Sequence, residues 1–218
     1  ATADSAREFV RVNVVNAASP VIDSVADLDG GAFGLTLAGT VAYVVGSANS
    51  QELALIGNGP GGVLGVIGSL DVDGNPSANV GITTVVRGTT AFLGADNGFY
   101  SIDISNPASP VKLGELLFGG SVRDIALNGR YAYLARGYNG PEISVVDVSD
   151  PTNLQAVGTF DDPAGIFNTN AVAVHGTRLY AGLSDRQDAI TSPPGRFLVL
   201  DIGANPTSPA LLGSRNSP

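Results

Sequence analysis

The chain has 218 residues, a formal net charge of −9 and only 14% charged residues. Its few Lys and Arg residues are scattered, which argues against nucleic acid as a partner because phosphate recognition requires clustered cations. The chain lacks cysteine, which excludes disulfides and thiol catalysis, and no apolar run reaches the ~18 residues of a membrane-spanning helix.

The first predicted element is half a repeat, over residues 9–25. It contains Asn13 and Pro20 in a pattern that returns along the chain: a strand ends in Asp or Asn, the backbone turns through an Asn/Asp-Pro pair, and a short strand follows. Proline presets such a turn and cannot continue a paired ladder. Further copies of the pattern start at Asp71, Asp103, Asp147 and Asp201.

A second pattern alternates with the first and reads apolar-x-Gly-x-x-small-aromatic-apolar. Its glycines are Gly39, Gly88, Gly129 and Gly176, at intervals of 49, 41 and 47 residues. Apolar residues alternate on both sides of each glycine, which predicts two strands joined by a hairpin. We expect the x-Gly pair, as in Asn128-Gly129, to form the two-residue turn.

The two patterns together supply four short strands per repeat, which is typical of a propeller blade. We therefore predict an all-β fold, a β-propeller of four-stranded antiparallel blades in one domain over residues 1–218. With the half-repeat there are about 4.5 repeats, which fits a five-bladed propeller or part of a larger one. A β-sandwich would not explain the alternation of two patterns. The complete repeats span about 33–72, 80–117, 122–160 and 170–213.

Two runs carry a family resemblance, Ile143-Ser-Val-Val-Asp147-Val-Ser-Asp-Pro151 and the segment from Gly120 to Leu134. They resemble the LVIVD-repeat propellers of bacteria and archaea. The resemblance implies the propeller fold and an exported or surface-anchored protein, so we expect an extracellular, cell-surface or periplasmic location. It brings no catalytic residues with it.

Polar residues lie just before the first strand of two predicted blades: Arg123 and Asp124 in one, Asn168 and Asn170 in the other. In propellers this strand faces the central channel, where ligands often bind. Other repeats have different residues at these places, so the four side chains form a candidate asymmetric binding site. The alternative is that they only form hydrogen bonds within the channel wall.

Two stretches are predicted to be irregular insertions, over residues 47–62 and 184–195. The second contains Asp185 and Arg186, which we include among the candidate binding residues because recognition often uses long loops on a rigid scaffold. The alternative is that both stretches are tolerated surface insertions.

Asp71, Asp73 and Asn75 are a candidate calcium site, because Asp-x-Asp-Gly-Asn places oxygen ligands on a tight loop. The glycine comes one position too early for an EF-hand loop, and the same residues also fit the repeat's own turn. No other cofactor is indicated.

The remaining polar residues favour structural roles. We expect Asp103, Asp147 and Asp201, with Asn13 in the first copy, to accept hydrogen bonds from the backbone of the turn that follows. His175 is the only histidine and sits beside the hairpin glycine, where an exposed turn residue is expected. No catalytic residue is predicted.

The sequence thus favours a non-enzymatic, extracytoplasmic binding or structural propeller that engages protein or glycan surfaces. Two alternatives stay open. One is a propeller-type glycosidase or lactonase that uses carboxylates in the channel. The other is a repeating subunit of a surface layer or filament, whose partners are copies of itself.

Overall fold

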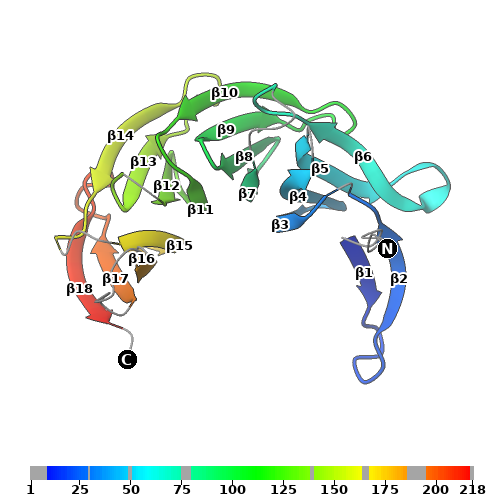
Figure 1. Ribbon diagram of the computed structural model, residues 1–218, viewed down its shortest axis with the longest axis horizontal. Coiled ribbons are helices and arrows are strands. Elements are labelled where there is room, and N and C mark those ends of the chain that lie inside the picture. The colour runs from blue at the N-terminus through cyan, green and yellow to red at the C-terminus, as the bar shows by residue number, and fades with distance from the viewer. Residues whose placement is uncertain are drawn as a thin grey trace, which may run out of the picture. The chain divides into compact units, whose positions relative to one another are not determined.

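The computed structural model describes residues 9–28, 30–48, 51–74, 80–137, 140–163, 167–185 and 195–216. These residues form one two-stranded sheet and four four-stranded sheets, each made of strands that are consecutive in the chain (Figure 1). Each strand pairs with the next one along the chain, as in a meander of antiparallel hairpins. The predicted fold class, a β-propeller type of four-stranded blades, is confirmed.

We call the two-stranded sheet the half-blade and the four larger sheets blades one to four. The half-blade is β1 (Phe9–Asn13) with β2 (Val21–Ala26), and blade one is β3 (Ala32–Ala38), β4 (Val41–Ala48), β5 (Gln51–Asn58) and β6 (Leu64–Leu70), with the 3-10 turn η1 (Pro60–Gly62). Blade two is β7 (Gly81–Arg87), β8 (Thr90–Ala95), β9 (Gly98–Asp103) and β10 (Val111–Leu117). Blade three is β11 (Val122–Asn128), β12 (Tyr131–Arg136), β13 (Ile143–Asp147) and β14 (Gln155–Phe160). Blade four is β15 (Phe167–His175), β16 (Arg178–Asp185), β17 (Arg196–Asp201) and β18 (Ala210–Asn216).

The chain divides into two compact units, residues 1–93 with 102–112, and residues 94–101 with 113–218. In the first unit, β3 and β4 both pack against β7, and a buried apolar cluster that includes Val44 and Ile56 lies in blade one. In the second unit, β11 and β12 pack against β15 in the same way, around Tyr133, Val145 and Leu198. The first two strands of one blade therefore cover the first strand of the next.

The hairpin turns follow the glycine pattern with a shift of one residue. Gly39, Gly88, Gly129 and Gly176 all have positive φ, between 57° and 61°. Asn128 pairs with Tyr131, so the two turn residues are Gly129 and Arg130. The prediction that Asn128-Gly129 forms the turn was wrong: Asn128 ends the strand, and glycine takes the first turn position, where the backbone has the positive φ that glycine adopts at no steric cost.

The predicted insertion over residues 47–62 was also wrong. Most of it is regular, since β4 runs to Ala48, β5 begins at Gln51 and η1 follows. Leu53 and Leu55 are fully buried in β5. The strand was not predicted for two reasons. Gly and Asn residues lie on either side of it, and Gly57 stands where the equivalent strand of other repeats ends in Asp.

Successive repeats are joined by one recurring contact. A glycine in the fourth strand of a blade lies against a backbone carbonyl of the Asn/Asp-Pro turn of the next repeat: Gly68 against Pro107, Gly114 against Pro151, and Gly158 against Thr207. A Cβ added at Gly114 would lie 2.6 Å from the Pro151 carbonyl oxygen, so these positions exclude a side chain.

Candidate functional site

Three polar side chains form a row in the second unit, at the start of the inner strands of blades three and four. Arg123 in β11 donates from Nη1 to Oδ1 of Asn170 in β15. Asn170 donates in turn to the Ser184 hydroxyl of β16, at 2.6 Å. Asn170 is exposed, and Arg123 and Ser184 are half-buried. We call Arg123, Asn170 and Ser184 the polar row.

Ser121 and Gly137 border the Arg123 side chain and hold its guanidinium in this row. The Arg123 Nε lies 3.5 Å from the Ser121 hydroxyl, and the side chain passes so close to Gly137 that a Cβ there would overlap it. Asp96 lies within electrostatic reach: partial desolvation raises the pKa of its carboxyl, and the positive charge of Arg123 offsets part of that rise. The row is therefore a fixed cation bordered by an amide, a hydroxyl and an acid.

The other predicted binding residues divide differently. Asp124 points into the protein, where its carboxylate accepts the backbone N–H of Ile125 and that of Val172 in β15, both at 2.9 Å. It therefore holds β11 and β15 together, which is the wall role that the sequence left open. Asn168 is buried at 5% exposure. Asp185 ends β16, with only its backbone described, and Arg186 lies outside the described residues.

The calcium candidate gains a residue that the sequence did not indicate. The carboxylates of Asp71, Asp73 and the buried Glu52 have oxygens within 4.8 Å of one another. Such a group has the donors that a hard cation prefers. However, Asp71 already accepts the backbone N–H groups of Asp73 and Gly74, as a turn residue does. Asn75 lies outside the described residues, and calcium here stays a prediction.

Glu52 also has a structural role that recurs in blade three. Its carboxylate accepts the backbone N–H of Val72 at 2.8 Å, and Glu142 accepts that of Asp162 at 2.8 Å. Both glutamates are almost fully buried, and burial raises the pKa of each. The signal in the sequence is a glutamate that precedes its backbone donor by 20 residues in two repeats.

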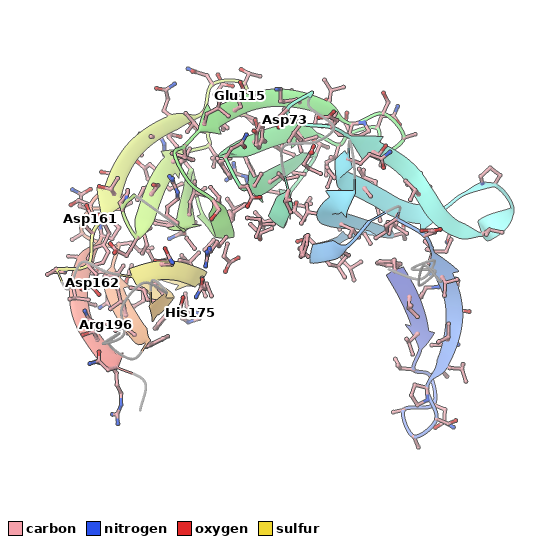
Figure 2. All side chains as sticks on the ribbon, in the orientation of Figure 1. Asp73, Glu115, Asp161, Asp162, His175 and Arg196 are labelled. Atoms are coloured by element: carbon pink, nitrogen blue, oxygen red, sulfur yellow. The ribbon has the colours of Figure 1, made fainter. Side chains whose placement is uncertain are left out.

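Asp162 is itself paired across to blade four. Its carboxylate lies 2.7 Å from the guanidinium of Arg196, and the Asp162 side chain is 1% exposed (Figure 2). Arg196 also donates to the Ser214 hydroxyl at 2.6 Å. This ion pair ties two blades together and was not predicted.

The predicted capping by the repeated acidic residues is confirmed. In each case the side-chain oxygen accepts the backbone N–H two residues further on, which is an Asx turn. The pairs are Asn13 with Val15, Asp103 with Ser105, Asp147 with Ser149, and Asp201 with Gly203, at 2.8–3.0 Å.

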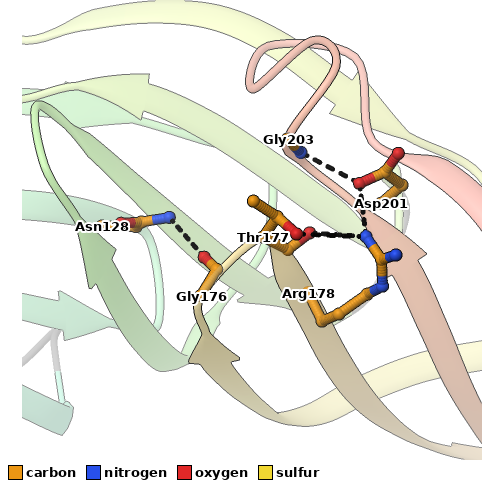
Figure 3. A network of polar contacts seen from close by, with 6 residues as sticks. All are labelled: Asn128, Gly176, Thr177, Arg178, Asp201 and Gly203. Atoms are coloured by element: carbon orange, nitrogen blue, oxygen red, sulfur yellow. Dashed lines mark hydrogen bonds and ion pairs between the residues drawn. The ribbon is translucent and has the colours of Figure 1, made fainter.

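Figure 3 shows how this turn connects to the hairpin end of the blades. Asp201 also pairs with Arg178 at 2.7 Å, and Arg178 donates to Thr177 beside the turn glycine. Asn128 of blade three donates to the carbonyl of Gly176 at 3.3 Å. His175, next to this glycine, is exposed as expected. The polar residues at this end therefore stabilise the turns and connect the turn of blade four to blade three.

The repeat patterns match a known family model. The model described as LVIVD repeat matches residues 84–116, 119–162 and 194–217. Three segments of the chain are thus similar to the LVIVD repeat. No curated protein matches it. The predicted resemblance is thereby confirmed.

Solved structures similar to this chain include a putative 6-phosphogluconolactonase from Bacteroides fragilis, at 14% identity and a TM-score of 0.66 over 91% of the chain and 61% of that protein. The outer coat vertex of COPII on membranes is similar at 15% identity and a TM-score of 0.61, over 88% of the chain and 52% of the coat chain. The chain thus spans less than two thirds of either protein. At these identities the likeness shows the fold alone.

No helix among the described residues is long and apolar enough to cross a membrane.

Proposed function

We propose that this chain is a non-enzymatic binding propeller of an exported prokaryotic protein, which engages a protein or glycan surface through the polar row. The observation that carries the proposal is the hydrogen-bonded series Arg123, Asn170 and Ser184, which three different strands hold at the solvent boundary. Strands position such a series more rigidly than loops do, which lowers the entropic cost of binding.

The chemistry of the row suits neutral polar partners. A guanidinium, an amide and a hydroxyl present both donors and acceptors, and the nearby Asp96 carboxylate adds an acceptor. Sugar hydroxyls and peptide groups need this mixture, whereas a strongly charged partner would need charges of one sign.

The backbone contacts of Asp124 favour a binding role over hydrolysis. A glycosidase needs two carboxylates about 5–9 Å apart that are free to exchange protons. Asp124 instead accepts two backbone N–H groups, one of them from Val172 in β15, so it is engaged in holding the two strands together. The similarity to a lactonase concerns the fold and gives no reason to expect turnover.

The test is binding to arrays of glycans and of peptides, compared between the labelled parent chain and two variants. We expect a set of array ligands whose binding falls at least about tenfold in the double variant Arg123→Ala/Asn170→Ala, since two polar contacts of ~1 kcal/mol each are lost. Arg215→Ala removes the same charge from an exposed site on β18 and should bind as the parent does.

Two results would contradict the proposal. One is equal loss of binding in the Arg215→Ala and the double variant, because charge alone would then explain it. The other is hydrolysis of an aryl glycoside or a lactone that Asp96→Asn abolishes, because the row would then belong to an active site.

A further inference from the structure

The half-blade lacks what every complete blade has on its inner side. Asn13 caps its turn as Asp103, Asp147 and Asp201 do, so β1 corresponds to the third strand of a blade. In blades one to four that strand lies between two others. Among the described residues, β1 pairs with β2 alone, which leaves its second edge open.

Burial at equivalent positions shows that β1 is uncovered on the side where a complete blade has its two inner strands. Val12 in β1 is 45% exposed, whereas Ile102, Val146 and Leu200 at the same place in blades two to four are fully buried. An apolar side chain is covered in three copies and uncovered in the fourth. The difference therefore lies in the neighbours of β1 and not in its sequence.

The first strand of blade one is uncovered in the same way. Leu35 in β3 is 55% exposed, whereas its counterparts Thr84, Ile125 and Val172 are each 7% exposed. Those counterparts lie on the first strands of blades two to four, and for β7 and β15 the covering elements are the first two strands of the preceding blade. Leu37, at 70% exposure, extends the same apolar strip.

A cavity joins the two exposed surfaces. It has a volume of about 480 Å³ and is lined chiefly by apolar side chains of the half-blade and blade one. Arg11 at its border is already paired, with Asp23 at 2.7 Å and with Asn58 at 3.2 Å, so it fixes the half-blade to β5 and adds no unpaired charge. We call Phe9, Val10, Val12, Leu35 and Leu37 the open face.

We propose that the open face binds a β-hairpin of the repeat's own Gly-aromatic type, which becomes the inner two strands of a completed blade. One strand of the hairpin would pair antiparallel with β1, as β12 pairs with β13. Its apolar face would cover Leu35 and Leu37, as β11 and β12 cover β15. This inference is independent of the polar row, because all of its residues lie in the first unit.

The other occupants fit the open face less well. A helix could fill the cavity but would leave the N–H and C=O groups of the β1 edge unpaired. A second copy of the chain would have to take a Gly-aromatic hairpin out of one of its own blades, where both strands are already paired. A small apolar ligand would leave the edge open as well.

The test uses a fluorescent synthetic peptide of residues 122–136, the β11–β12 hairpin with its Gly129-Arg130 turn, titrated with the purified chain. We expect saturable binding that falls at least about tenfold in Leu35→Asp, because a buried leucine contact is replaced by a charge. Leu212→Asp is the matched control, since Leu212 is 54% exposed on β18, and it should bind as the parent does. Leu37→Lys replaces Leu35→Asp if that variant does not fold.

A second measurement addresses the pairing itself. Amide hydrogen exchange across β1 should slow when the peptide is bound, and a peptide with Gly129→Val, which cannot form the turn, should give neither binding nor slowing. The proposal is overturned if no saturable binding occurs, or if Leu35→Asp binds as tightly as Leu212→Asp. It is also overturned if the chain dimerises through Leu35 as its concentration rises, because the occupant would then be a second copy.

Discussion

Glu52 and Glu142 are acidic residues placed where charge is disfavoured. Each accepts a backbone N–H, which favours the carboxylate, but burial raises the pKa of both and the neighbouring aspartates add to the rise. Each glutamate therefore holds the backbone just after the fourth strand of its blade, but its buried charge lowers the stability of the fold. This destabilisation depends on pH.

Replacement of Glu52 by glutamine should stabilise the chain at neutral pH. The folded-state pKa of Glu52 lies above its ordinary value of 4.5, so wild-type stability falls as pH rises from that value through the folded pKa. Glutamine keeps an acceptor for Val72 and does not ionise. In urea unfolding, Glu52→Gln should exceed the wild type in unfolding free energy at pH 7, with the difference closing at and below about pH 4.5. Glu115→Gln removes the same charge at an exposed site on β10 and is the control for the change in net charge.

The same experiment tests calcium at Glu52, Asp71 and Asp73. If the cluster binds the ion, millimolar calcium should stabilise the wild type and reverse the order of the two proteins, since Glu52→Gln removes one ligand. If Glu52→Gln is still the more stable protein with calcium present, the carboxylates do not bind the ion and serve only to hold the backbone after β6.

At the scale of elements, the repeats are joined by a glycine lying under the next repeat's turn. Gly158 faces the carbonyl of Thr207 in this way. Gly213 has the equivalent place in β18, and no atom of the described residues lies within 4 Å of the position that its Cβ would take. The chain therefore carries its own control for this contact.

Gly158→Ala should be destabilising and Gly213→Ala should be close to neutral. The added methyl at position 158 must push the turn of blade four away, at a cost of about 1–3 kcal/mol, whereas the methyl at position 213 meets open space. Urea unfolding of the two variants measures the difference. Equal effects would mean that β-propensity, and not the contact between repeats, sets the cost.

The sequence predicted the strands and turns because the same two patterns occur in several repeats. Four glycines indicated the hairpins, and Asn13, Asp103, Asp147 and Asp201 indicated the capped turns, and these were confirmed. The further copy at Asp71 was wrong, because Asp71 follows the fourth strand of blade one and not the third. The sequence did not predict the structural features that occur in only one or two blades. β5 was hidden where Gly57 replaces the usual aspartate, and the pairing of Asp162 with Arg196 joins residues 34 positions apart.

The candidate site was only partly predictable for the same reason. Position in the repeat was enough to select Arg123, Asp124 and Asn170 together. It could not tell that Arg123 and Asn170 meet at the surface while Asp124 turns inward, because that depends on the backbone N–H of Val172 in the next blade. Ser184 and Asp96 were missed because neither belongs to a repeated pattern.

At the scale of the whole molecule, the charge balance limits its partners. With 20 acidic against 11 basic residues, the sequence pI is about 4.3. We expect no binding to a labelled DNA duplex by fluorescence anisotropy, even at about 50 mM salt where phosphate contacts are strongest. Retention by DNA at that salt, lost in Arg123→Ala, would instead make the polar row a phosphate site.

The glycine contact also bears on how a chain like this one lengthens. Blades two and three each carry both parts of this contact: Pro107 and Pro151 lie against the glycine of the preceding repeat, and Gly114 and Gly158 lie against the turn of the next one. A tandem duplication of one repeat would thus insert a unit already matched to both of its neighbours. New copies could then diverge at their strand starts, where Phe33, Ile82, Arg123 and Asn170 already differ, while the joint between repeats stays the same.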